Sequence, residues 1–174
     1  MNVVEYNTGL QRLSTAFHSG NIYLDSFLKG PNALDPNTGK TYVFLSEEND
    51  AIIGYYNIGT GDVEYVEDGL RRKAGGSVHI NCFALDENYH GFQQSISNTG
   101  EVINLSDVLL RDCLERIYKI RETCVGFTFI TLASTEAGYS LYKRNEFEEL
   151  EEDMAFSTEE ISDCIPMLYV IDQI

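Results

Sequence analysis

The sequence predicts an α/β protein with a mixed sheet. Segments rich in β-branched and aromatic residues alternate with segments of helical period along the 174 residues. The strand–helix–strand order around residues 106–120 implies one parallel, right-handed crossover. The chain length and the 43% hydrophobic composition suit one domain, predicted over residues 1–174.

The first half of the chain is predicted to contain two short helices and a hairpin. Turn residues, of which Gly30-Pro31-Asn32 is one group, separate these elements. Gly59-Thr60-Gly61 is expected to end the hairpin, and a loop carrying Arg71-Arg72-Lys73 is expected to follow it. The predicted elements are helices Gln11–Phe17 and Ile22–Leu28, and strands Thr41–Leu45 and Ile52–Ile58.

The second half has the strongest helical pattern of the chain, at Ser106–Ile120. Its apolar residues form one stripe, and ion pairs such as Asp112/Arg116 are expected on the opposite face. The strand before this helix, Ser77–Leu85, ends in residues that are apolar on both faces, which indicates burial. The remaining predicted elements are strand Val125–Leu132, helix Glu136–Arg144, and strands Asp153–Phe156 and Ile165–Ile171.

The charge of the chain restricts its partners. It carries 12 Lys and Arg against 28 Asp and Glu, a formal net charge of −16. Such a surface repels nucleic acid and attracts cationic partners, although surplus charge also serves solubility alone. Neither a membrane-spanning stretch nor a secretory signal is found, so a cytoplasmic protein is expected. The four cysteines show no metal-ligand spacing and are expected to be buried, reduced thiols.

Four fragments, in this order, carry a resemblance to a known family: "FHSGNIYLDSFLK" (17–29), "AIIGYYNI" (51–58), "FALDENYHG" (83–91) and "LYKRNEF" (141–147). With them the chain resembles the GNAT family of acetyl-CoA-dependent N-acetyltransferases, and the first fragment resembles its toxin-like branch. In the last fragment Glu146 replaces the family's glycine. The resemblance implies a mostly antiparallel sheet of six to seven strands flanked by helices, with acetyl-CoA as co-substrate.

The resemblance also implies roles for particular residues. Backbone groups of Phe83, Ala84 and Leu85 would bind the pantetheine arm, and the Tyr142 phenol would protonate the departing thiolate. A phenol is a suitable donor to a leaving group of similar basicity. The alternative for Phe83–Leu85 is buried strand core, and the alternative for Tyr142 is aromatic packing.

The family's pyrophosphate loop is altered in this chain. His90 stands where the family has Gln or Arg, Gly91 follows, and Leu105 and Ser106 correspond to the loop's last positions. An insertion of about 92–104 lies between them, with a hairpin pattern around Asn98-Thr99-Gly100. Helix N-termini bind anions, so the start of the Ser106–Ile120 helix could still hold a pyrophosphate. Gln93 or Gln94 would then supply the hydrogen bonds that the missing glycines no longer allow. The alternative is that the site is lost.

Glu101 in the arm, Asp86 and His79 are candidate general bases, and a water relay is equally open. The alternative for each of the three residues is a solvated or capping side chain. Direct attack of the amine on the thioester is expected, because no cysteine occupies an obvious nucleophile position. The acceptor is expected to be a small-molecule amine or a protein lysine, and a homodimer is left open. Two alternatives remain: a non-catalytic GNAT-like binding module, and a tRNA-acetylating toxin neutralised by an antitoxin.

Overall fold

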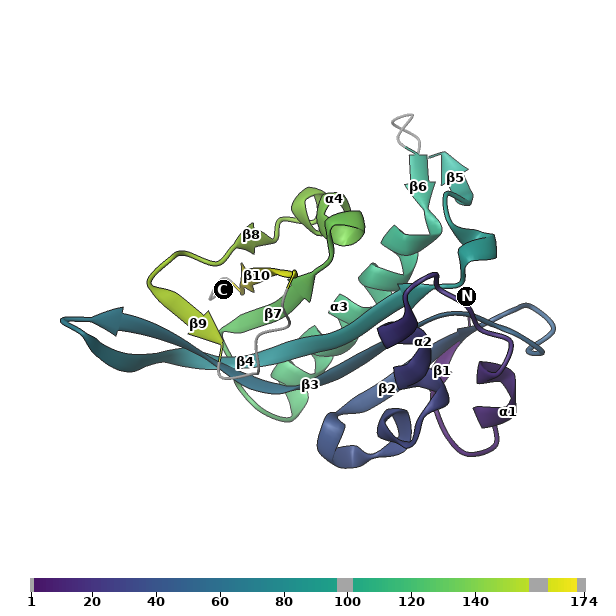
Figure 1. Ribbon diagram of the computed structural model, residues 1–174, viewed down its shortest axis with the longest axis horizontal. Helices are drawn as coiled ribbons and strands as arrows, with labels where there is room; N and C mark the ends of the chain where they lie inside the picture. Colours follow the sequence, from purple (N-terminus) through teal and green to yellow (C-terminus); the bar gives the residue numbers. More distant parts are fainter. Residues whose placement is uncertain (1, 97–101, 157–162, 172–174) are drawn as a thin grey trace. The chain divides into compact units, whose positions relative to one another are not determined.

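The computed structural model describes residues 2–96, 102–156 and 163–171 (Figure 1). Contacts group the chain into two compact units, which are described one at a time. The first comprises Met1–Ile58 and Cys82–Arg116, and the second comprises Gly59–Asn81 and Ile117–Ile174. The elements that run through both units are β3 (Ile52–Glu67), β4 (Leu70–Leu85) and α3 (Leu105–Thr123). The single domain expected over residues 1–174 stays a prediction.

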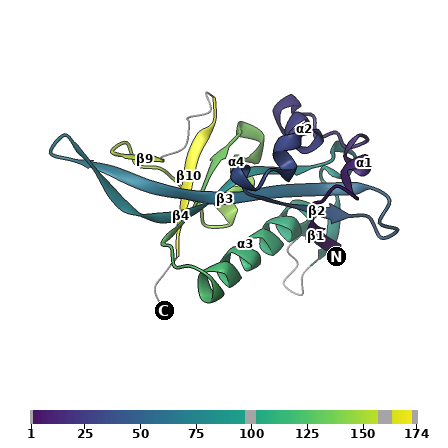
Figure 2. The same cartoon turned by 90° about the horizontal axis from the view of Figure 1, so that it is seen from below.

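In the first unit, helices cover both faces of a small sheet. Figure 2 shows α1 and α2 on one face of β2 and β3, and α3 on the opposite face. The order β1–β2–β3 is antiparallel throughout, with Val4 opposite Val43 and Val43 opposite Tyr55. The elements that lie wholly in this unit are β1 (Asn2–Glu5), α1 (Gln11–Ser14), α2 (Ile22–Lys29), β2 (Lys40–Leu45), β5 (Gln93–Ile96), β6 (Val102–Asn104) and the short 3₁₀ helices Pro31–Leu34, Pro36–Thr38 and Glu87–Tyr89.

Neighbouring residues of β3 explain how this sheet holds helices on both faces, since successive strand side chains point in opposite directions. Tyr55 is fully buried, packs edge-on against Phe17 with ring centroids 5.5 Å apart, and donates to the Leu24 carbonyl at 2.7 Å. Tyr56, also fully buried, donates to Oδ2 of Asp112 on α3 at 2.6 Å. The Asp112/Arg116 pair therefore faces the sheet, and its predicted place on the exposed face of the helix was wrong.

The second unit contains the parallel crossover. Strand β4 pairs in parallel with β7, from Ser77 opposite Phe129 to Ile80 opposite Leu132, as predicted. Its other strand pairs, β7 with β10, β10 with β8, and β3 with β9, are antiparallel. The mixed, mostly antiparallel sheet is confirmed; it has eight described strands, one or two more than expected. The elements that lie wholly in this unit are β7 (Phe129–Ser134), α4 (Glu136–Arg144), β8 (Glu148–Glu149), β9 (Met154–Phe156) and β10 (Ile165–Val170).

The predicted break at Gly59-Thr60-Gly61 was wrong, because β3 continues through it to Glu67. A Cβ on Gly59 would lie 2.8 Å from Nδ2 of Asn81, and one on Gly61 would lie 3.0 Å from Oγ of Ser77. These glycines therefore admit close side chains of the next strand. The chain turns instead at Asp68-Gly69, both with positive φ (53° and 75°), so the cation triplet Arg71-Arg72-Lys73 lies in β4 and not in a loop.

Several smaller expectations were also corrected. The first helix ends at Ser14 and not at Phe17, and β7 begins at Phe129, four residues later than predicted. Of the cysteines, Cys82 and Cys113 are buried as expected, whereas Cys124 is exposed. Among the residues that the structure describes, no helix is long and apolar enough to span a bilayer. The same residues contain no His, Cys, Asp and Glu group that could hold a metal ion.

Candidate active site

The end of β4 is the part of the first unit to which the sequence assigns cofactor binding. The parallel register with β7 ends at Ile80, before the predicted residues Phe83, Ala84 and Leu85. Ala84 and Leu85 are buried, 5% and 8% exposed, so the strand-core interpretation of their side chains holds. The Leu85 carbonyl lies 3.0 Å from Nε2 of His90. The predicted loop residue His90 is thus folded back onto the predicted strand end.

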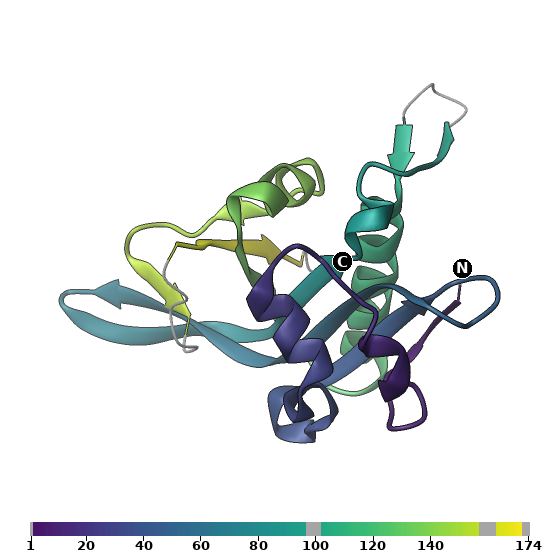
Figure 3. The same cartoon turned by 45° about the vertical axis from the view of Figure 1, so that its right-hand side comes forward.

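The arm between His90 and α3 contains two antiparallel strands, as predicted, while the predicted turn at Asn98-Thr99-Gly100 lies outside the described residues. β5 and β6 pair antiparallel, with Gln93 opposite Asn104. The two residues at the base of the arm are also hydrogen-bonded, because the Leu105 N–H donates to the Phe92 carbonyl at 3.0 Å. Figure 3 shows this arm extending from the start of α3. The chain therefore leaves at Phe92 and returns beside it at Leu105, so the insertion does not displace the helix start from the loop.

This closure affects the anion-binding capacity of the helix start. The Leu105 N–H, one of the expected donors to a pyrophosphate, is used by the Phe92 carbonyl. The Asn104 N–H donates to the Asp107 carboxylate at 3.2 Å, which places a negative charge in the first turn. Gly91 keeps a left-handed conformation (φ 74°) in open surroundings. The chain thus meets itself at Phe92 and Leu105, and an N–H group that was expected to bind a pyrophosphate is used within the chain.

Asp86, a candidate general base, instead fixes the backbone. It is 5% exposed, and its Oδ2 accepts from the His18 N–H at 2.9 Å. Its Oδ1 accepts from the backbone and side-chain nitrogens of Asn88 at 3.1 and 2.8 Å, which caps the short helix Glu87–Tyr89. These bonds account for the carboxylate, so the capping interpretation of Asp86 is the one that the structure supports.

One cluster in the first unit was missed by the sequence analysis. The His18 imidazole lies beside the Asp25 carboxylate, with Nδ1 and Oδ2 3.1 Å apart. Asp25 also accepts from Oγ of Ser19 at 2.6 Å and from the Ser19 N–H at 2.7 Å. The residues "HSGN" were interpreted only as a break between two helices and as part of the resembling fragment 17–29. A signal was present, because Asn21 caps α2 and thereby places Asp25 one turn into the helix, facing the loop.

In the second unit, Tyr142 lies on α4, which has the predicted bounds. The residue is 6% exposed, and its ring meets Phe147 edge-on at 5.8 Å. A Cβ on Gly138 would lie 3.2 Å from Cε2 of Tyr142, so the glycine makes room for the ring. After the helix, Glu146 adopts a left-handed conformation (φ 67°), and the Phe147 N–H bonds back to the Tyr142 carbonyl at 3.1 Å. The family's glycine position is thus kept in conformation although not in residue type.

His79, the third candidate base, lies deep in the second unit. Its Nδ1 is 2.8 Å from Oγ1 of Thr131, and its ring packs edge-on against Phe156 at 5.5 Å. Burial lowers the pKa of His79 from 6.5 to about 4. A neutral, enclosed imidazole of this kind is a core residue held by Thr131. Glu101, the remaining candidate base, lies outside the described residues, as do the side chains of Gln93 and Gln94.

The basic triplet that could have bound nucleic acid is neutralised by cross-strand partners. Arg71 pairs with Glu64 at 3.5 Å, and Arg72 pairs with Glu67 at 2.8 Å. Lys73 likewise pairs with Asp62 on the same neighbouring strand. In the acidic run 146–153, Glu148 and Glu149 form β8 at the edge of the sheet and are exposed. Exposed charges at a sheet edge discourage pairing with a further strand.

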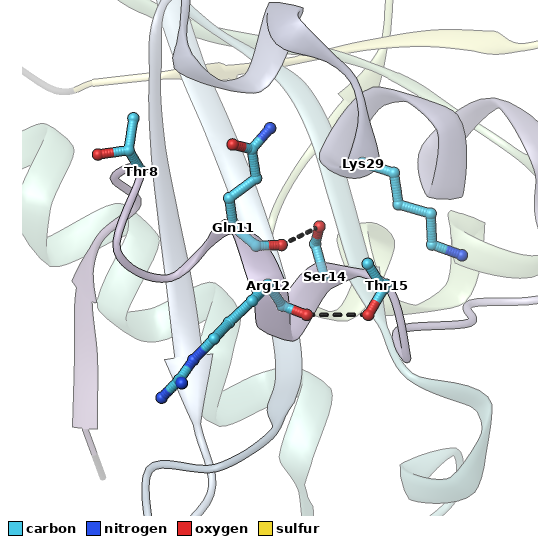
Figure 4. A pocket seen from close by; sticks show the side chains of 6 residues that line it. All are labelled: Thr8, Gln11, Arg12, Ser14, Thr15 and Lys29. Atoms are coloured by element: carbon cyan, nitrogen blue, oxygen red, sulfur yellow. Dashed lines mark hydrogen bonds between the residues drawn. The ribbon is translucent and has the colours of Figure 1, made fainter.

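A hollow of about 530 Å³ lies between α1 and α2. Figure 4 shows its lining, in which the Arg12 guanidinium and the Lys29 ammonium extend to opposite sides. The nearby hydroxyls bond to the backbone of the preceding turn, Ser14 to Gln11 and Thr15 to Arg12, both at 2.8 Å. The charges and hydroxyls do not converge, so the hollow is a surface feature of the two helices.

The strand order of the mixed sheet and the parallel crossover from β4 through α3 to β7 define a GNAT fold. Among solved structures, the chain is similar to that of a bacterial toxin. The two share 16% sequence identity, the match covers 97% of this chain and 90% of the toxin chain, and the TM-score is 0.67. It is also similar to "Crystal structure of AtaTR bound with AcCoA", with 14% identity, 97% and 92% coverage and a TM-score of 0.71. For "AtaT complexed with acetyl-methionyl-tRNAfMet" the identity is 15%, the coverage 95% and 92%, and the TM-score 0.62. No protein-family model and no curated protein sequence matches the chain.

Proposed function

We propose that the protein is an acetyl-CoA-dependent N-acetyltransferase that transfers an acetyl group to a primary amine by direct attack. The observation that carries the proposal is the return of the chain at Phe92 and Leu105, which keeps the path from β4 through the loop into α3 despite the insertion. The likeness to the structure of AtaTR bound with acetyl-CoA supports acetyl-CoA as the cofactor.

In this proposal the first unit contributes the groups that hold the cofactor. Backbone groups of Phe83, Ala84 and Leu85 bind the pantetheine arm. His90, Gly91, Leu105 and Ser106 border the pyrophosphate. Because the Leu105 N–H is already used, the loss of one hydrogen bond to a charged acceptor weakens binding by about 1.5–3 kcal/mol, unless the arm opens.

The second unit contributes the acid. Tyr142 protonates the thiolate of coenzyme A as the C–S bond breaks. Its ring is held by Phe147 and by the space that Gly138 leaves, so the phenol is fixed in direction.

The acceptor that fits the charge is cationic, such as a polyamine or a lysine side chain of a protein. The net charge of −16 attracts such amines, and the pairing of the Arg71-Arg72-Lys73 triplet removes one of the two basic clusters that could oppose them. Acetylation also removes one positive charge from a cationic acceptor, so the acidic surface attracts the product less.

Calorimetry with acetyl-CoA, followed by a thiol-release assay with spermidine, a lysine-rich peptide and methionyl-tRNA, tests the proposal. We expect saturable binding and turnover with spermidine or the peptide. Tyr142→Phe should bind acetyl-CoA normally and turn over about 10²-fold more slowly. Tyr139→Phe, on the exposed side of the same helix where the hydroxyl bonds to Glu149, is the matched control and should retain wild-type turnover. Equal rates for both variants would remove Tyr142 from the mechanism.

A second candidate function is acetylation of aminoacyl-tRNA. One observation favours it, the likeness to the structure of AtaT complexed with acetyl-methionyl-tRNAfMet. Turnover confined to methionyl-tRNA in the same assay would select it. A third outcome, no acetyl-CoA binding at millimolar ligand, would indicate a GNAT-like binding module, in agreement with the internal use of the Leu105 N–H.

A further inference from the structure

Four aromatic residues of the second unit form a continuous series that begins at Tyr142. The ring of Tyr142 meets Phe147 edge-on at 5.8 Å, and the ring of Phe147 lies 5.6 Å from that of Tyr169 at an angle of 48°. The Tyr118 hydroxyl donates to the Tyr169 hydroxyl at 3.1 Å. We propose that Tyr169 is a positioning residue for Tyr142 and acts through Phe147; this rests on the proposed acetyltransferase function, in which Tyr142 is the acid.

Phe147 transmits its position to Tyr142 because the two residues are joined twice. The Phe147 N–H donates to the Tyr142 carbonyl at 3.1 Å, and the two rings are in contact. Phe147 is only 1% exposed, so its ring has no open solvent into which it could move. Side chains in such a core are close-packed, and a shift of one ring displaces its neighbours. The direction of the Tyr142 phenol therefore depends on the residues that hold Phe147 in place.

Tyr169 is fixed by its backbone and by its hydroxyl. It lies on β10, opposite Ile130 of β7, and β7 is the strand that leads into α4 and Tyr142. Its hydroxyl accepts from Tyr118, and burial together with this bond raises the pKa of Tyr118 to about 12. Tyr118 thus keeps its proton, and can donate it to the bond, throughout the neutral and mildly alkaline range in which amine acetylation is measured.

An acid of this kind is sensitive to small displacements. The phenol has to direct its O–H toward the sulfur as the C–S bond breaks, and a misplacement of about 1 Å can slow such a step about 10²-fold. Loss of the Tyr169 ring should therefore lower kcat and leave the acetyl-CoA Kd unchanged. A merely structural role of Tyr169 would instead act equally whether or not residue 142 carries a hydroxyl.

A double-mutant cycle between Tyr169 and Tyr142 separates the two roles. Coenzyme A release is measured at saturating acetyl-CoA with the acceptor that the wild type uses best among spermidine, the lysine-rich peptide and methionyl-tRNA. We expect Tyr169→Leu to lower kcat about tenfold, with an unchanged acetyl-CoA Kd. In the Tyr142→Phe background the same substitution should change kcat by less than about twofold, because no acid is left to position.

Two variants that keep the aromatic rings extend the test in case Tyr169→Leu does not fold. Tyr118→Phe and Tyr169→Phe each remove only the bond between the two hydroxyls. Each should lower kcat about threefold, and again only where the Tyr142 hydroxyl is present. The matched control is Phe156→Leu, which removes a ring of the same unit that packs on His79 and should keep the wild-type kcat.

The outcomes distinguish this role from the proposed function. A loss of kcat that is equally large in both backgrounds, or an active wild type whose folded Tyr169 and Tyr118 variants all keep its rate, overturns the role of Tyr169 alone. A Tyr142→Phe variant as fast as the wild type removes the acid and the role of Tyr169 with it. A wild type that releases no coenzyme A with any of the three acceptors overturns the proposed function as a whole.

Discussion

The start of α3 and the end of α4 depart from the GNAT sequence pattern in different ways. At α4 a single residue changes, and Glu146 takes up the left-handed conformation that the family's glycine would adopt. At α3 a hairpin of about a dozen residues is inserted, and the chain closes it with one hydrogen bond between Leu105 and Phe92. In both places the sequence signature is lost, and a local backbone feature, a left-handed residue or a closing hydrogen bond, stands where it would be.

The costs of these two departures differ in kind. A side chain in the left-handed region strains the α4 end by about 1–2 kcal/mol, a cost in stability. The closure at α3 uses an N–H group that an anionic ligand could have taken, a cost in affinity. Stability and cofactor binding can therefore be varied separately in this chain, and four substitutions test that separation.

The largest expected effect concerns His79 on β4, which lies opposite Thr131 of β7, the strand that leads into α4. The pKa of His79 is lowered to about 4 from 6.5, so the unfolded state binds more protons between these values. Stability should be fully present above pH 6.5 and fall by about 3 kcal/mol as the pH drops to 4. Urea unfolding at several pH values should show that His79→Gln loses this slope. Thr131→Val should keep it, since burial and not the Thr131 bond lowers the pKa; equal slopes in wild type and His79→Gln would contradict the assignment.

The second prediction concerns the anchoring of α3 to the sheet. Asp112→Ala removes the acceptor of Tyr56 and the partner of Arg116, which also bonds to the Tyr56 hydroxyl at 2.7 Å and stacks over Tyr42. We expect a loss of about 2–3 kcal/mol in the free energy of unfolding. Glu115→Ala, on the exposed face of the same helix, should change it by less than about 0.5 kcal/mol. Similar losses in both variants would show that Asp112 acts only through helix propensity.

The third prediction addresses affinity. Replacing residues 93–103 by Gly-Ser-Gly removes the paired strands that hold Phe92 against Leu105. If the Leu105 N–H then becomes available to the pyrophosphate, the acetyl-CoA Kd should fall about tenfold, the equivalent of one charge-assisted bond. Calorimetry measures the acetyl-CoA Kd directly. A higher or unchanged Kd would mean that the arm itself contributes to the cofactor site.

The smallest effect is expected at α4. Glu146→Gly relieves the left-handed strain but adds chain entropy to the unfolded state, so a net gain of about 1 kcal/mol is expected. For a chain of this length, that is about 2–4 °C in Tm. Glu148→Gly, in the extended strand β8, should lower Tm instead. A lower Tm for Glu146→Gly would show that the Glu146 carboxylate stabilises the protein by more than the left-handed backbone of this residue destabilises it.

The sequence was sufficient for the elements whose determinants are local. The bounds of α4, the approximate span of α3 and the hairpin arm follow from periodicity and turn residues, and the structure confirms them. The continuation of β3 could not be foreseen in the same way, because Gly59 and Gly61 act as breakers unless Asn81 and Ser77 lie across from them. The turn at Asp68-Gly69 was nevertheless readable, since this pair is a strong hairpin signal.

The candidate site divides along the same line. The structure brings His90 next to Leu85, and Leu105 next to Phe92, while the cofactor-binding role of these residues stays a prediction. The approach of Tyr56 to Asp112 depends on tertiary packing, which no spacing in the sequence encodes. The approach of His18 to Asp25 is local and follows from the Asn21 cap of α2. For Asp112 the helical period was correct but the face was wrong, because a carboxylate bonded to a buried phenol can lie on the side that apolar residues normally occupy.

The hydrogen bond that closes the arm has a practical consequence. An amide held by a neighbouring carbonyl exchanges its proton with heavy water slowly, and its rate reports local opening. The Leu105 amide should therefore exchange slowly in the unliganded protein and more quickly in any state where the hairpin separates at its base. A single backbone resonance would then show whether the arm opens before the nucleotide enters.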